Sequence, residues 1–228
     1  MGDNMRPIIG VVARFIEADG FVRTNVSEGI RRKIIECGGI PIMIMPTQNI
    51  NYLEVRYDDQ EELSLEEKEM LIKQINLCDG IILPGGNKIN KFDRFIAQYV
   101  INNDIPTLGI CLGMQILSNY KKEKLWNEKN DSSIIHKTTD KNAHYVSIEE
   151  KSKLFTIVKS SRFMVNSRHN YHVVPNPYFD SVAFSDDGYI EAIEMKDKKF
   201  VVGVQWHPET LEDEESKSLF TYFINICK

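Results

Sequence analysis

The sequence lacks the features that mark membrane-spanning, secreted and nucleic-acid-binding proteins. It contains no run of about eighteen apolar residues, and its first ten residues, MGDNMRPIIG, hold no basic segment followed by a long apolar stretch. Lysine and arginine are scattered rather than gathered into a stripe, and the formal net charge is −5. These absences disfavour a nucleic acid or an anionic membrane as a partner, and they predict a cytoplasmic protein that binds a small molecule.

Cysteine is also sparse, and no two cysteines form a C-x-x-C pair. The four are Cys37, Cys78, Cys111 and Cys227. Their wide spacing and different sequence contexts argue for reduced thiols rather than for disulfide bonds. Three of them sit inside apolar patterns and are expected to be structural, whereas Cys111 is flanked by glycines.

The histidines and glutamates follow no familiar metal-binding spacing. The residues on which a zinc site could draw are His144, His169, His172, His207 and Glu209. However, the sequence has neither an HxxxH helix motif nor paired cysteines. His136 lies in a polar segment and is predicted to be solvated. We therefore predict no metal ion and no organic cofactor.

The first half of the chain alternates between two kinds of pattern. The 228 residues, 42% of them hydrophobic, show no internal repeat and are predicted to form one domain spanning residues 1–228. Short apolar runs predict strands at 8–12, 40–45, 79–83, 106–110 and 200–205, and amphipathic stretches predict helices at 26–36, 64–76, 91–102 and 214–226. Ser64 and Glu67 have the spacing of a helix-capping box. This alternation predicts a parallel sheet with helices on both faces.

The second half shows the shorter period of antiparallel strands. Strands are expected at 144–148, 181–184 and 189–194, with DDG at 186–188 as a hairpin turn. The polar segment at 121–142 is predicted to be an exposed excursion without a core element. The sheet as a whole is therefore predicted to be mixed.

The segment GICLGMQ at 109–115 has the form of a nucleophile elbow. Glycines on both sides of Cys111 allow a tight turn from a strand into a helix, which pushes the cysteine out at the carboxyl edge of the sheet. The helix start favours the attacking thiolate. The backbone N–H of Leu112 and one from the glycine turn at 84–86 could stabilise an oxyanion. The alternative is that Cys111 is a small buried hydrophobe in a core helix.

A nucleophilic thiol needs a base, and HPE at 207–209 follows another predicted buried strand. His207 and Glu209 are two positions apart, so on extended backbone they lie on the same side and Glu209 can orient the imidazole. The alternative is a surface loop with a solvated acid. Both segments follow carboxyl ends of predicted parallel strands, where such a sheet places its active cleft.

A third polar segment is VNSRHNYHV at 165–173. Asn166, Ser167 and His169 supply hydrogen-bond donors and acceptors that suit the ammonium and carboxylate groups of an amino acid. The alternative is a surface loop whose polar groups cap one another.

Five motifs together resemble a known family. They are LPGG at 83–86, GICLGMQ at 109–115, VNSRHN at 165–170, DDGYIEAIE at 186–194 and GVQWHPE at 203–209. In this order they resemble the class I glutamine amidotransferase-like hydrolases, and in particular the C26 peptidase branch that contains γ-glutamyl-γ-aminobutyrate hydrolase. The resemblance covers nearly the whole chain and implies a flavodoxin-like α/β fold.

The resemblance also implies roles for individual residues. It implies a catalytic triad of Cys111, His207 and Glu209, oxyanion donors at Gly86 and Leu112, and substrate recognition by Gln115, Asn166, Ser167 and His169. It implies no metal and no cofactor.

The sequence departs from the branch at three places. The branch commonly reads PGGxDVxPxxYG, where this chain has PGGNKINKFD. It often has glutamine where this chain has Tyr171, and a GG-containing turn where this chain has NYKKEKLW. All three places are expected to border the cleft, and γ-aminobutyrate is therefore not assigned as the leaving amine.

The resemblance implies a hydrolase that cleaves the γ-glutamyl amide bond of a γ-glutamyl amine or a glutamine-like substrate through a cysteine thioester. The products are glutamate and an amine. Two alternatives stay open: a glutaminase subunit that passes ammonia to a separate synthetase, and a non-catalytic binding module on the same fold. A homodimer or a synthetase is correspondingly open as a partner.

Overall fold

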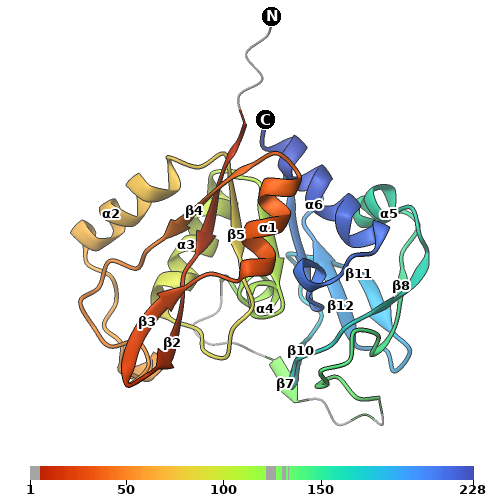
Figure 1. Ribbon diagram of the computed structural model, residues 1–228, viewed down its shortest axis with the longest axis horizontal. Helices are drawn as coiled ribbons and strands as arrows, with labels where there is room; N and C mark the ends of the chain where they lie inside the picture. The colour runs from red at the N-terminus through yellow and green to blue at the C-terminus, as the bar shows by residue number, and fades with distance from the viewer. Residues whose placement is uncertain (1–5, 122–126, 130–131, 133) are drawn as a thin grey trace, which may run out of the picture.

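Five parallel strands form one half of a mixed sheet in the computed structural model, which describes residues 6–121, 127–129, 132 and 134–228 (Figure 1). In spatial order they are β4 (Ile40–Ile44), β1 (Ile8–Val12), β5 (Gly80–Leu83), β6 (Thr107–Ile110) and β13 (Val201–Val204). Every residue of the last three is buried, as expected for parallel strands that are covered on both faces. The five predicted strands of the parallel sheet are confirmed.

Antiparallel strands continue the same sheet beyond β13. They are β12 (Ile190–Glu194), β11 (Asp180–Ser185), β8 (His144–Ile148) and β9 (Arg162–Val165), while β10 (Tyr171–Val173) pairs with both β12 and β7 (Asn127–Lys129). The predicted hairpin turn between β11 and β12 is confirmed, and its Gly188 has the positive φ of 85° that glycine adopts without strain. The prediction of a mixed sheet is therefore also confirmed.

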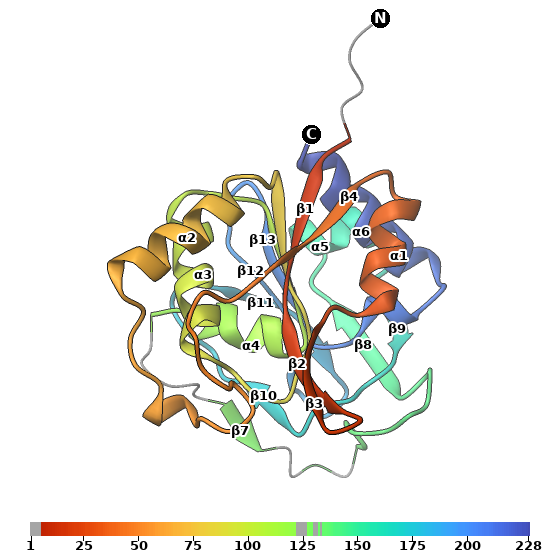
Figure 2. The same ribbon diagram turned by 60° about the vertical axis from the view of Figure 1, so that its left-hand side comes forward.

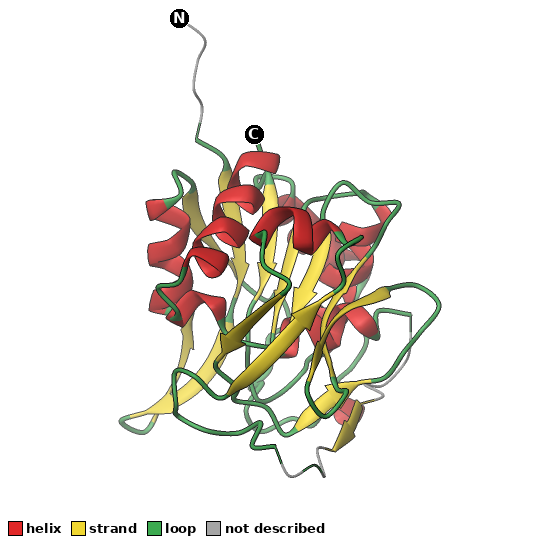
Figure 3. Ribbon diagram, turned by 90° about the vertical axis from the view of Figure 1, so that its right-hand side faces the viewer, coloured by secondary structure: helices red, strands yellow, loops and turns green. Residues whose placement is uncertain are grey.

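Helices cover both faces of the sheet, as predicted (Figures 2 and 3). One apolar cluster joins the sheet to α1 (Glu28–Glu36), α5 (Lys153–Val158) and α6 (Glu214–Ile226), and the other joins it to α2 (Leu65–Ile75), α3 (Lys91–Asn102) and α4 (Leu112–Ser118). Short 3₁₀ turns occur at Tyr57–Asp59 and Pro208–Thr210. The capping box of α2 is present, because the side chains of Ser64 and Glu67 each bond the other's backbone N–H.

A hairpin of β2 (Arg14–Ala18) and β3 (Phe21–Asn25) was not predicted from the sequence pattern. Its turn, Asp19-Gly20, has φ values of 53° and 77°. Asp-Gly is a strong hairpin signal because both residues tolerate positive φ. The hairpin projects from the carboxyl edge of the parallel strands (Figure 1). Strand β9 and helix α5 were likewise not predicted.

The polar segment at 121–142 differs from its prediction in one respect that matters for the site. Part of it lies outside the described residues, but His136 is only 3% exposed rather than solvated. Its burial has a physical reason, because its ring bonds Asp187 and lies against two other histidines. Within the part of the chain that the structure describes, no helix has both the length and the apolar character that a membrane span requires.

Candidate active site

Cys111 occupies the predicted elbow between β6 and α4 and has the strained backbone of such a turn, with φ 52° and ψ −106°. The two glycines are required by close packing. A Cβ at Gly113 would overlap the carbonyl oxygen of Leu83, and one at Gly109 would lie 2.8 Å from the carbonyl of Gly113. The sequence thus folds into an elbow because only glycine lets α4 approach the sheet this closely.

His207 stands beside the cysteine and is held by the predicted carboxylate. Its Nδ1 lies 2.8 Å from Oε1 of Glu209, which leaves Nε2 as the ring nitrogen for the thiol. Burial lowers the pKa of His207, but the hydrogen bonds and charges of Cys111 and Glu209 outweigh it and raise that pKa to about 10. The imidazole therefore holds a proton at neutral pH. Gly85 makes room for the ring, since a Cβ there would lie 2.7 Å from Cε1 of His207.

Asn166 positions the histidine from behind. Its Oδ1 accepts the backbone N–H of His207 at 2.8 Å, and its Nδ2 donates to the His207 carbonyl at 2.9 Å and to Oγ1 of Thr210 at 3.0 Å. Ser167 is fully buried, and its hydroxyl donates to the carbonyl of His136 at 2.7 Å. Neither residue lines a cavity of the site. The structure therefore does not support the predicted contact of these two side chains with substrate, because both are directed into internal hydrogen bonds and away from the cavities.

The glycine turn after β5 is oriented by an arginine that the sequence analysis did not identify. Arg14 donates to the carbonyls of Pro84 at 2.9 Å and Gly85 at 3.2 Å, and it is itself held by the buried carboxylate of Asp93 at 2.6 Å. In a trans peptide the C=O and the following N–H point in opposite directions. Arg14 therefore aims the N–H of Gly86 away from itself. Its position two residues after the carboxyl end of β1, at the start of β2, was the available signal.

Two cavities meet at this turn. The first, about 390 Å³, is lined by Tyr57, Gly86, Asn87, Lys88, Ile89, Cys111, Leu112, Gln115, Arg168, His169, Asn170 and Tyr171. The second, about 410 Å³, is lined on the catalytic side by Gly86, His207 and Glu209 and on the other by the β2–β3 hairpin and residues 52–53. Cys111 and both predicted oxyanion donors therefore line the first cavity, and His207 lines the second.

Gln115 and His169 lie at the wall of the first cavity, as predicted for substrate-binding residues. Nε2 of Gln115 donates to the carbonyl of Tyr171 at 3.1 Å and to Oε1 of Gln205 at 3.2 Å, and Nδ1 of His169 contacts the same carbonyl at 3.0 Å. These bonds fix both side chains. Arg168, which was not predicted, is exposed and lines both cavities.

Two of the three departures from the family pattern border the cavities, as expected. Asn87 and Lys88 line both of them, and Lys88 anchors the facing loop by donating to the carbonyls of Tyr52 at 2.6 Å and Val55 at 2.5 Å. Tyr171 lines the first cavity. The third departure falls largely on residues 122–126, outside the described residues.

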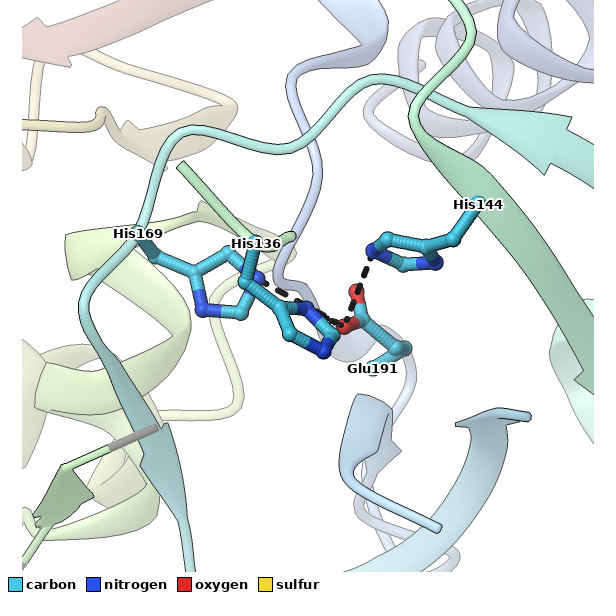
Figure 4. Close-up of side chains that lie close together, drawn as sticks. All are labelled: His136, His144, His169 and Glu191. Atoms are coloured by element: carbon cyan, nitrogen blue, oxygen red, sulfur yellow. Dashed lines mark ion pairs between the residues drawn. The ribbon is translucent and has the colours of Figure 1, made fainter. Parts of the chain in front are cut away.

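A second group of titratable side chains is buried together, and one member, His169, also lines the first cavity (Figure 4). It contains His136, His144, His169 and Glu191, whose ligand atoms all lie within 4.8 Å of one another. Of the residues considered for zinc from the sequence, the structure brings only His144 and His169 into this group. His172 stacks on Tyr189, and His207 belongs to the triad.

Comparison with known proteins identifies the family of this chain. The model of the Peptidase C26 family matches residues 90–209. The γ-glutamyl-γ-aminobutyrate hydrolase PuuD of Escherichia coli is 28% identical over 97% of this chain and 94% of its own. One subunit of the glutamine-hydrolysing GMP synthase of Methanothrix thermoacetophila is 31% identical over 75% of this chain and 88% of its own.

Solved structures show the same fold at lower identity. The glutaminase domain of the CTP synthase of Trypanosoma brucei, solved with bound acivicin, has a TM-score of 0.65 and 19% identity over 97% of this chain and 93% of its own. The chain therefore belongs to the Peptidase C26 family of class I glutamine amidotransferase-like hydrolases.

Proposed function

We propose that this protein hydrolyses a γ-glutamyl amide through a thioester on Cys111. The observation that carries the proposal is the shared cavity, in which the elbow cysteine and the backbone of Gly86 and Leu112 lie together next to the His207–Glu209 pair. A thiol, a general acid and base, and paired backbone donors are the parts that acyl transfer from an amide requires.

The reaction proceeds in two halves. The Cys111 thiolate, whose proton His207 already holds, adds to the δ-carbonyl carbon, so that the carbonyl oxygen becomes an oxyanion held by the N–H groups of Gly86 and Leu112. The C–N bond then breaks as His207 returns the proton to the leaving amine. Water, deprotonated by His207, next adds to the thioester and releases glutamate and the thiol. The raised pKa of His207 suits its role as the acid, because the proton is present at neutral pH.

The two cavities suggest which part of the substrate goes where. Cys111 lines the first cavity and His207 the second. The glutamyl group therefore occupies the first cavity, and the amine that His207 protonates leaves through the second. Arg168 makes no ion pair with a carboxylate of the described residues, and its place at the junction suits it to bind the α-carboxylate of the glutamyl group.

The test is glutamate release from a panel that contains glutamine, γ-glutamyl-γ-aminobutyrate and γ-glutamyl anilides. Wild-type protein should release glutamate from at least one member, and the C111A variant from none. Cys37→Ala is the matched control, because Cys37 directly follows α1, lines neither cavity and should leave the rate unchanged. Equal activity of C111A and wild type would exclude the proposed nucleophile.

A second candidate, a glutaminase subunit that delivers ammonia to a synthetase, is favoured by one observation. The β2–β3 hairpin, which borders the second cavity, exposes Phe21 (69%), Val22 (47%) and Ile16 (42%). Such an apolar surface at the exit for the amine suits a docked partner. Glutamine hydrolysis that appears only after a synthetase is added would favour this candidate, and activity of the isolated chain on a γ-glutamyl amine would exclude it.

A further inference from the structure

Three imidazoles converge on one carboxylate oxygen in the buried group shown in Figure 4. Nδ1 of His136, Nε2 of His144 and Nε2 of His169 lie 3.5, 3.6 and 3.5 Å from Oε1 of Glu191. These distances are longer than charged hydrogen bonds, which measure about 2.7–2.9 Å. The four side chains are 0–3% exposed, so bulk solvent does not reach the space between them.

The opposite nitrogen of each ring is already bonded to an oxygen that can only accept. Nε2 of His136 lies 2.9 Å from the carboxylate of Asp187, and Nδ1 of His144 and of His169 lie 3.1 and 3.0 Å from the backbone carbonyls of Tyr145 and Tyr171. Each neutral ring must therefore carry its proton on that outer nitrogen. The inner nitrogen of each ring is left with a lone pair directed at an anionic oxygen.

A nitrogen lone pair that faces a buried carboxylate oxygen is repelled by its negative charge unless a cation lies between the two atoms. Zinc binds histidine nitrogen at about 2.0–2.1 Å, and a regular tetrahedron of that radius has edges of about 3.3–3.4 Å. The three nitrogen–oxygen separations of 3.5–3.6 Å are close to these edges, and all four ligand atoms lie within 4.8 Å of one another. The bonds on the outer nitrogens are those by which proteins orient metal-ligating histidines.

We propose that His136, His144, His169 and Glu191 bind one zinc ion in a closed tetrahedral site. Three neutral imidazoles and one carboxylate suit zinc among the divalent metals, and four protein ligands leave no open position for substrate or water. The site is structural, and this inference does not depend on the proposed hydrolase activity.

The ion would stabilise the loop that carries His169 at the edge of the first cavity. His169 follows Asn166, which holds His207, and the backbone N–H of His169 donates to the carbonyl of His136 at 2.8 Å. His144 begins β8 and Glu191 lies in β12. One ion would thus join four segments that are separate in sequence and rigidify the loop between β9 and β10.

The test is the metal content of the full chain, purified without a polyhistidine tag. After equilibration with zinc and removal of loosely bound metal by gel filtration, mass spectrometry should find about one zinc per chain. Cobalt in place of zinc should show the intense visible absorption of tetrahedral Co²⁺. Removal of zinc with a strong chelator should lower the Tm by at least about 5 °C, and added zinc should restore it.

Variants distinguish this site from adventitious binding. His144→Gln and Glu191→Gln should each reduce the zinc content at least about tenfold, whereas the control His172→Gln, which removes a neighbouring histidine outside the group, should keep it. Folded wild-type protein that takes up no zinc would overturn the proposal, and this outcome does not depend on whether the variants fold. Equal zinc in all variants, or preference for another metal from an equimolar mixture, would also overturn it.

Discussion

The catalytic triad and the buried histidine group each contribute a residue to the lining of the first cavity, but they are encoded in opposite ways. The triad comes from two short motifs. In GICLGMQ the glycine spacing predicts the elbow, and in HPE the i,i+2 spacing predicts the His–Glu pair. The histidine group comes from four segments with no regular spacing, and strand pairing brings them together. A site built from short motifs can thus be predicted from one sequence, whereas a site that strand pairing assembles from distant segments cannot.

The two regions also differ in their access to solvent and substrate. The His207 side chain is 13% exposed and borders a cavity of about 410 Å³, so it can exchange a proton with a bound molecule. The four side chains of the histidine group are almost completely buried. This contrast separates a group suited to proton transfer from a group suited to holding an ion, and single variants should affect one region without the other.

The largest effect is expected for Cys111→Ala. Removing the nucleophile abolishes the thioester, so the rate of glutamate release should fall on the order of 10⁴-fold or more. The zinc content should stay at that of the wild type, because Cys111 is not part of the histidine group. Glutamate assays and metal analysis on the same preparation check both halves. A loss of zinc in this variant would contradict the separation of the two regions.

Glu209→Gln should cost on the order of 10²–10⁴-fold in kcat/KM, because the imidazole loses the carboxylate that orients it and stabilises its cation. It should also change the pH profile. In the wild type the pKa of His207 is raised to about 10, so its proton is present at neutral pH, and we expect the alkaline limb of activity near pH 10. Glu209 contributes to that increase, and the limb should therefore move to lower pH in the variant. An unmoved limb would assign it to a different group.

Most of the fold followed from periodicity, because buried parallel strands and amphipathic helices each impose a pattern that a single sequence displays. The β2–β3 hairpin was not predicted because its strands contain no buried residue and so show no apolar pattern. The Asp19-Gly20 turn is its only signal in the sequence. His136 was predicted to be solvated because its sequence neighbours are polar. Its burial depends on Asp187 and on two other histidines, which are distant in sequence.

The same limit applies to the residues that support the triad. Arg14 and Asp93 are 79 positions apart, and their pairing depends on how the starts of β2 and α3 meet at the glycine turn. Asn166 and Ser167 were predicted to face substrate from their polarity and from the family resemblance. Polarity does not reveal direction, and the structure turns the first toward His207 and the second toward the carbonyl of His136.

Arg168→Gln should raise the KM for a γ-glutamyl amide by roughly 10–100-fold and leave kcat nearly unchanged, because a charge-assisted bond to a carboxylate contributes about 1.5–3 kcal/mol. Arg31→Gln is the matched control, since Arg31 is an exposed arginine that pairs with Glu28 on α1 and borders neither cavity. Steady-state kinetics on both variants measure KM and kcat separately and so test this prediction. A fall in kcat at constant KM would place Arg168 in the chemical step instead.

The smallest effect is expected for Ser167→Ala, which tests the link between the two regions. The hydroxyl bonds the carbonyl of His136 at 2.7 Å, but that carbonyl also accepts the backbone N–H of His169 at 2.8 Å and would keep a partner. The variant should therefore lose only about 1 kcal/mol of unfolding free energy and retain its zinc. Urea denaturation measures the first quantity and metal analysis the second. KM should change less than about threefold, because Ser167 is buried away from both cavities, whereas direct contact with substrate would raise KM by about tenfold or more.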